Sequence, residues 1–330
     1  MMKFKLFRVL IQLGSGVVII LWLLQLSSIE KVLTLILMIN PLNIVLASIF
    51  FIIASTFVAL SLYVSIKPIE ASAPIGKIIL GSFAGQLLSD VTPVRSGYFV
   101  TPLILKEQCN VPIKKGIVGV LTTGIVNSFV KVILSVIALL YFISFLPLNP
   151  MIINALIAGI LFLLGVGVVL LVTLIEKRIL RFAMIFEKIP IIKVITRKLI
   201  EMLNQIQGGV NIKKQFLKIF LLMLLSIITN AIALQFISDG LGFRSPSLIE
   251  FVFIATLVGS LMYIPVTIAG LGVQETGYVL LLTLLGMPFE KAVAFALLTR
   301  VLFTGTDIIG LPALIKIGFK KYEVKNNALK

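Results

Sequence analysis

The sequence predicts an all-α polytopic membrane protein with six spanning helices and two re-entrant helix pairs, arranged as an inverted repeat. Three observations lead to this fold class. Of the 330 residues, 59% are hydrophobic and only 13% are charged, whereas about a quarter of the residues of a soluble domain are charged. Apolar runs of spanning length recur along the whole chain. Two further apolar stretches are interrupted in the middle by proline, glycine and charge.

Six segments are long and apolar enough to cross a bilayer, which takes about 20 residues of helix. The first of them could be a signal peptide, but no small-x-small cleavage site follows it, so we interpret it as a retained span. The predicted spans are Phe7–Leu26, Pro41–Ile66, Gly116–Leu146, Met151–Ile175, Phe216–Ile237 and Ala292–Ile315.

The stretches 75–105 and 246–287 are too broken to be single spans. Residues 90–97 (DVTPVRSG) interrupt the first stretch, and residues 269–277 (AGLGVQETG) interrupt the second. Non-helical backbone at membrane depth is tolerated only inside protein or beside a wet cavity. We therefore expect each stretch to be a re-entrant pair of short helices.

The net charge of +16 is explained by the orientation of the chain in the membrane and does not require binding to nucleic acid. With the N-terminus inside, 23 of the 29 lysines and arginines fall on the cytoplasmic side, as the positive-inside rule requires. We expect a multi-pass protein of the cell (plasma) membrane with cytoplasmic N- and C-termini. The basic segment 176–215 would be two amphipathic helices on the inner membrane surface or an ordinary cytoplasmic loop.

The whole chain, 1–330, is expected to be a single transmembrane domain with two similar halves, about 41–146 and 216–318. Residues 95–98 (RSGY) precede 275–278 (ETGY) by 180 positions, and 112–116 (PIKKG) precede 288–292 (PFEKA) by 176. The predicted topology opens the first broken pair from the cytoplasm and the second from outside, so the halves are inverted. Inverted repeats with broken helices are a transporter architecture.

Six charged side chains fall inside apolar segments, and each would cost about 2.5–3.5 kcal/mol at a helix centre without a partner. In the register of the repeat, Arg95 corresponds to Glu275, so we expect this pair to meet near the bilayer midplane. Arg300 lies two turns from Asp307, too far for an intrahelical bond. We therefore expect its guanidinium to contact the phosphate of an anionic headgroup. The alternative is that these charges form a static clamp between two helix bundles.

The candidate ligand-binding site combines these charges with polar and glycine residues of the broken segments. Thr123, Asn127 and Lys131 form one polar stripe on a helix, which should face the interior. The glycines could instead be packing and turn residues. The predicted ligand-binding residues are Asp90, Pro93, Arg95, Gly97, Asn127, Lys131, Gly270, Gly272, Glu275, Gly277, Arg300 and Asp307.

Catalytic and metal sites are not expected. One cysteine and no histidine exclude a disulfide framework, a Cys/His metal centre and His-dependent acid–base catalysis. We also expect no cofactor.

The two interrupting motifs resemble those of the flippase-like transmembrane family, which includes the membrane half of lysylphosphatidylglycerol synthases. Residues 269–275 (AGLGVQE) resemble the family's G-G-L-G-V-R-E, and residues 90–97 resemble N-x-x-P-G-R-x-G-E. The chain departs from the family at Val94, where glycine is common, and at 123–127 (TGIVN), where E-R-x-x-D is common. These departures put the first-half site in doubt.

The resemblance implies translocation of a lipid or lipid-linked molecule between leaflets by a protein that is not an enzyme. The implied partners are membrane lipids, an anionic phospholipid or lipid-linked headgroup, with a homo-oligomer or a separate soluble transferase as further partners. One alternative is an intramembrane transferase acting on a lipid headgroup or polyprenyl phosphate, with Asp90, Glu275 or Asp307 as base. The other is a non-transporting scaffold subunit.

Overall fold

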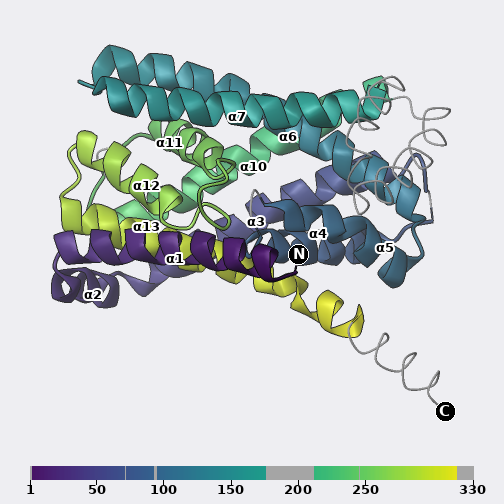
Figure 1. Cartoon of the computed structure of the whole chain (residues 1–330), viewed down its shortest axis with the longest axis horizontal. Coiled ribbons are helices and arrows are strands. Elements are labelled where there is room, and N and C mark those ends of the chain that lie inside the picture. Colours follow the sequence, from purple (N-terminus) through teal and green to yellow (C-terminus); the bar gives the residue numbers. More distant parts are fainter. Residues whose placement is uncertain (1, 71, 93–94, 176–211, 245, 318–330) are drawn as a thin grey trace.

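The computed structural model describes residues 2–70, 72–92, 95–175, 212–244 and 246–317, and all regular structure in these ranges is helical (Figure 1). Five helices of this part of the chain are long and apolar enough to cross a membrane. They are α3 (Pro41–Ile66), α6 (Ile113–Phe145), α7 (Pro150–Ile175), α10 (Ile212–Gly240) and α13 (Phe289–Asp307), the last continuing through η3 (Ile308–Gly310) to Ile317. The predicted all-α fold class and multi-pass character are confirmed.

The N-terminal span is bent into two helices, α1 (Met2–Leu26) and α2 (Ile29–Met38), whose axes differ by 90°. The two count as a sixth span only if they are taken together. Sequence analysis did not predict α2. It packs against α13, and Lys31 Nζ lies 3.2 Å from Glu290 Oε1.

Each of the two interrupted stretches forms two short helices joined by a non-helical loop. In the first stretch α4 (Ile75–Ser89) leads through the loop to η1 (Ser96–Val100) and α5 (Thr101–Cys109). In the second stretch α11 (Leu248–Leu261) leads to α12 (Val273–Leu284). The paired helices pack against each other, α4 on α5 and α11 on α12.

Residues with positive φ angles lie in both loops, just before the helix that follows each loop. In the first loop Arg95 has φ 55°, and in the second Ala269 has φ 48°, followed by Gly270 at 70° and Gly272 at 80°. A left-handed residue cannot continue an α-helix, so the chain turns at these points. The left-handed conformation is sterically unfavourable for arginine and alanine, which have a Cβ atom, but not for glycine.

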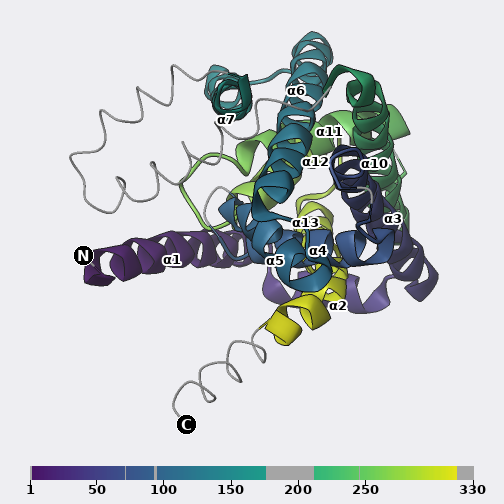
Figure 2. The same ribbon diagram turned by 90° about the vertical axis from the view of Figure 1, so that its right-hand side faces the viewer.

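The long helices α3 and α10 lie side by side (Figures 1 and 2). Ser226 of α10 donates a hydrogen bond of 2.9 Å to the carbonyl of Ala54 in α3. Helix α3 also packs against α4 and α6, and α10 also packs against α11 and α13. The remaining long helix, α7, packs against α6 and α11.

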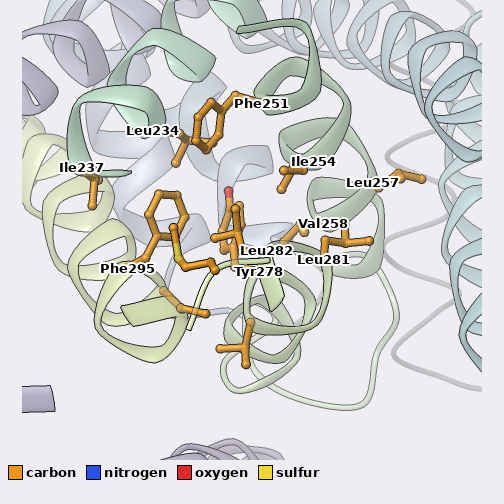
Figure 3. Packing of buried hydrophobic residues seen from close by; sticks show 14 of the residues in the cluster. Leu234, Ile237, Phe251, Ile254, Leu257, Val258, Tyr278, Leu281, Leu282 and Phe295 are labelled. Carbon is orange, nitrogen blue, oxygen red and sulfur yellow. The ribbon is translucent and has the colours of Figure 1, made fainter. Parts of the chain in front are cut away.

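One apolar core cluster includes residues of α10, α11, α12 and α13 (Figure 3) and extends to α3, α6 and α7. In it the ring centroid of Phe295 lies 6.1 Å from that of Phe251 and 5.6 Å from that of Tyr278. Helices in lipid associate through close packing more than through the hydrophobic effect. This interlocked aromatic core therefore fixes the position of α12 relative to α13.

The predicted basic segment 176–215 falls outside the described residues except for its last four positions, which open α10. Pro93, a predicted site residue, also lies outside them.

Candidate functional site

A cavity of about 250 Å³ lies among α3, the first broken segment, α6, α7 and α10. Its lining surface is mostly apolar and includes Val166 and Leu170 from α7 and Met223 and Ile227 from α10. Its polar side chains are Ser55, Gln86, Ser89, Arg95, Ser96, Tyr98, Thr123, Asn127, Ser128, Lys131, Ser226, Asn230 and Tyr263. The space is therefore amphipathic, as a site for a lipid headgroup would be.

A second cavity of about 70 Å³ adjoins the first and extends it toward the second half of the chain. Arg95, Lys131 and Asn230 line both cavities. Gln274 at the start of α12 and Thr299 in α13 line only the second. The two cations thus lie where the polar spaces of the two halves meet.

The guanidinium of Arg95 is held in the wall of the cavity by its own loop. Its Nη2 lies 3.0 Å from Asp90 Oδ1, and its Cζ lies 5.5 Å from the centroid of the Phe303 ring. Its backbone carbonyl accepts a hydrogen bond of 3.1 Å from Ser89 Oγ. Because the Asp90 side chain is only 2% exposed, its negative charge lies behind Arg95 and not on the cavity wall.

Lys131 faces the cavity with no counterion among the described residues. Its Nζ lies 6.0 Å from the centroid of the Tyr263 ring, and that part of the chain offers it no hydrogen bond or ion pair. Thr123 and Asn127, two turns and one turn before it on α6, line the same cavity. The polar stripe predicted on this helix therefore faces the interior, as expected.

Several buried polar atoms around the cavities have no hydrogen-bond partner within the described residues. Gln86 Nε2 and Asn230 Oδ1 belong to residues that line the larger cavity, and Gln274 Oε1 and Thr299 Oγ1 to residues that line the smaller one. A buried polar atom without a partner costs about 1–3 kcal/mol. These four atoms therefore favour occupation of the cavities by a polar ligand or by water.

The expected pair between Arg95 and Glu275 does not form, and this prediction was wrong. Arg95 pairs with Asp90, and Glu275 pairs with Arg300, where Nε lies 2.5 Å from Oε1. Both of these charges pair with a residue close by in the sequence or in a neighbouring helix. The register proposed from the sequence aligned the two positions but could not say which helix faces meet.

The expectation that Arg300 keeps free donors for a headgroup was also wrong. Its Nη2 donates to Glu275 Oε2 at 3.3 Å and to the carbonyl of Gly270 at 3.1 Å, and its Nη1 donates to the carbonyl of Ala269 at 3.4 Å. Arg300 lines neither cavity. Arg300 instead joins α13 to α12 and to the loop before it, so this pair is a structural contact but does not hold two helix bundles together.

The glycines among the predicted site residues make close backbone contacts. Gly272 has φ 80° and donates its N–H to Glu275 Oε2 at 2.7 Å, and a Cβ there would lie 2.7 Å from Ile19 of α1. Gly97 lies against the Leu88 backbone, and Gly277 packs against Val258. These positions, with Gly270, shape the broken segments and lie outside the cavity lining.

Asp307 is fully buried at the end of α13. Its Oδ1 accepts a long hydrogen bond of 3.5 Å from Ser55 Oγ, and its Oδ2 has no partner among the described residues. Of the predicted site residues, the structure therefore places Arg95, Asn127 and Lys131 on the cavity wall. Asp90 and Asp307 lie behind that wall.

Sequence analysis missed the contributions of Ser55, Gln86, Asn230 and Tyr263 to the cavity. Ser226 and Asn230 are spaced i, i+4 in an apolar helix, so the same polar-stripe criterion would have found them. The same criterion applies to Gln86, which lies between Ser82 and Ser89 on one face of α4. Ser55 is one of several serines scattered along α3, and only the packing of that helix places it at the site.

Comparison with known proteins gives one family. The family described as "Lysylphosphatidylglycerol synthase TM region" matches residues 9–307, which include both broken segments and all the cavity residues. No curated protein matches the chain.

Proposed function

Because the chain belongs to the family of lysylphosphatidylglycerol synthase transmembrane regions, we propose that it translocates a lipid or lipid-linked molecule between the leaflets of the cell membrane. The polar cavity would hold the headgroup during transfer. The observation that carries this proposal is the cavity itself: two cations and unpartnered polar atoms of Gln86 and Asn230 at the centre of a bundle of apolar helices.

A polar space among membrane-spanning helices is costly unless it has a function, since polar and ionisable groups in a bilayer mark substrate pathways. The apolar residues of the lining, such as Val166 and Leu170, suit acyl chains, and its polar residues, such as Asn127 and Lys131, suit a headgroup. Both requirements of a lipid substrate are met in one space.

The proposal includes an inverted repeat in which each broken segment is re-entrant. Equivalent helix contacts support it: α3 packs on α4 and α6 as α10 packs on α11 and α13, and α6 packs on α11 as α13 packs on α4. The two halves would then rock about the central α3–α10 contact to expose the cavity to alternate leaflets. The N- and C-termini are proposed to be cytoplasmic.

The experiment uses purified protein in vesicles that contain a phospholipid with a fluorescent headgroup. A membrane-impermeant quencher added outside the vesicles removes the fluorescence of each labelled lipid that reaches the outer leaflet. Protein-dependent exchange between leaflets is expected. Asn230→Leu, which replaces an unpartnered polar group of the cavity, should slow the exchange, whereas the adjacent Thr229→Leu, outside the cavity lining, should not.

The other outcomes separate the alternatives. No exchange above that of empty vesicles contradicts the proposal. Covalent modification of the lipid headgroup, measured by mass spectrometry on the same vesicles, would indicate the intramembrane transferase. If there is neither exchange nor modification, the scaffold subunit is favoured. The transferase would need a carboxylate as base, and among the described residues no aspartate or glutamate lines either cavity.

A further inference from the structure

We infer that the cavity selects an anionic phosphate headgroup that carries no amino acid, and that Lys131 is the residue that binds the phosphate. This inference rests on the proposed function and specifies its substrate. It differs from what the family name alone suggests, because lysylphosphatidylglycerol carries a lysyl ester with two ammonium groups in addition to its phosphate.

The charges on the cavity wall decide between the two kinds of headgroup. Arg95 and Lys131 line both cavities, and no carboxylate of the described residues lines either one. A lysyl group entering this space would face the uncompensated Lys131 and Arg95, whose charge Asp90 balances from behind the wall. It would find no carboxylate of the described residues on the cavity wall, and juxtaposed like charges are a strong term against binding. An anionic phosphate would be attracted to both cations and would meet no carboxylate of the described residues on the wall.

Lys131 is the better candidate for direct contact with the phosphate because its charge is uncompensated. Arg95 already has Asp90 at 3.0 Å, whereas Lys131 faces only the ring of Tyr263 among the described residues. An ammonium has three donors and no acceptor, and all three are free to bind phosphate oxygens. The hydrogen bond of a charged donor to a charged acceptor is about twice as strong as a neutral one.

The neighbouring polar groups complete the site. Asn127 lies one turn before Lys131 on α6 and lines the same cavity, and Asn230 lines it from α10 with an unpartnered Oδ1. A carbonyl oxygen accepts from hydroxyl groups, so it suits a polyol next to the phosphate. The apolar residues Val166 and Leu170 of α7 in the same lining favour a lipid over free phosphate.

The experiment measures binding to the full-length protein in detergent micelles by native mass spectrometry and titration calorimetry. Four probes are compared: short-chain phosphatidylglycerol, the same lipid with a lysyl ester on its headgroup, short-chain diacylglycerol, and inorganic phosphate. Phosphatidylglycerol is expected to bind about tenfold or more tightly than the lysyl ester, which corresponds to the removal of one unfavourable charged contact. Diacylglycerol should bind more weakly than phosphatidylglycerol.

Three variants locate the binding group. Lys131→Gln should lower the affinity for phosphatidylglycerol about tenfold, the loss expected for a charge-assisted hydrogen bond, and should reduce the discrimination against the lysyl ester. Lys131→Arg should retain most of the affinity. Lys218→Gln, which removes an exposed cation from α10, should leave the affinity unchanged and controls for general attraction of anions to a basic protein.

Tighter binding of the lysyl ester by the wild-type protein would overturn the inference without any variant. Binding of phosphatidylglycerol to Lys131→Gln with wild-type affinity would overturn the role of Lys131. Binding of inorganic phosphate without binding of phosphatidylglycerol would overturn the lipid as its source. Selective binding in a protein that does not exchange lipids would sustain the inference while contradicting the proposed function, so the two can fail separately.

Discussion

Arg300 of α13 and Glu275 of α12 form a two-point ion pair, with Nε 2.5 Å from Oε1 and Nη2 3.3 Å from Oε2. The same carboxylate accepts the N–H of Gly272, and the same guanidinium donates to the carbonyls of Ala269 and Gly270. The pair therefore ties the end of the second broken loop that leads into α12 to the next long helix.

We expect Arg300→Ala to destabilise the protein by about 3–5 kcal/mol, because it leaves the buried carboxylate of Glu275 without its counterion. Arg300→Lys should recover only part of this loss, since an ammonium cannot make the two-point contact of a guanidinium. Unfolding in detergent with increasing denaturant measures both variants. Lys31→Ala, which breaks an ion pair whose lysine side chain is 67% exposed, should change stability by about 1 kcal/mol or less. Wild-type stability of Arg300→Ala would show that the pair does not hold the loop.

Asp90→Asn should increase the affinity of the cavity for anions, because it removes the charge that compensates Arg95. Arg95→Gln should have the opposite effect. Binding of short-chain phosphatidylglycerol to the two variants measures the difference, and melting temperatures recorded in parallel identify any loss of folding. Equal affinities for the two variants would show that the Arg95 side chain does not act on the ligand.

Gly310→Ala is expected to disrupt the packing of η3 on α4. A Cβ at this position would lie 2.1 Å from the backbone nitrogen of Ala84, too close for any rotamer to relieve. The matched control is Gly305→Ala, five residues earlier, where nothing lies within 4 Å of the added Cβ. Alanine is favoured over glycine within a helix by about 0.5–1 kcal/mol, so the control should be neutral or stabilising. Melting temperatures compare the two, and similar effects would contradict the close contact.

Glu70, in the loop between α3 and α4, should make stability depend on pH. The hydrogen bond from Ser72 at 2.7 Å, and then that from Lys115 at 3.0 Å, lower the pKa of its carboxyl below the ordinary 4.5. A carboxyl with a lowered pKa in the folded state contributes stability above its ordinary pKa and loses it as the pH falls through the folded-state value. The melting temperature of the wild type should therefore exceed that of Glu70→Gln at pH 7, and the difference should shrink below about pH 4.5. A difference that stays constant with pH would contradict this account.

The orientation is tested by labelling single cysteines in a Cys109→Ala background. Asn149, exposed between α6 and α7, should react with an impermeant reagent added from outside the cell. A cysteine at Lys67, at the end of α3, should react only from the cytoplasmic side. The reverse pattern would invert the proposed topology.

The sequence by itself determined the class of the protein, its long helices and the location of the first break. The second break was predicted at 269–277 but lies between Leu261 and Val273, so residues 273–277 belong to α12. The ends of α3 coincide with the predicted span, and α6 and α7 begin within three residues of theirs. These features are local: a run of apolar residues must be helical in lipid because its backbone groups have no other partners. The polar stripe of Thr123, Asn127 and Lys131 followed from helical periodicity alone.

Only the tertiary structure decided which charges pair and which remain free. Every buried charge needs a partner, but the sequence offered several partners for each. The packing of α12 on α13 brings Glu275 within ion-pair distance of Arg300, and the turn at Arg95 brings its guanidinium within ion-pair distance of Asp90. Lys131 is left facing the cavity with no counterion in the described part of the chain. Which charged side chains pair depends on which helix faces come within a few ångströms of one another. The order of the residues along the chain does not specify those distances.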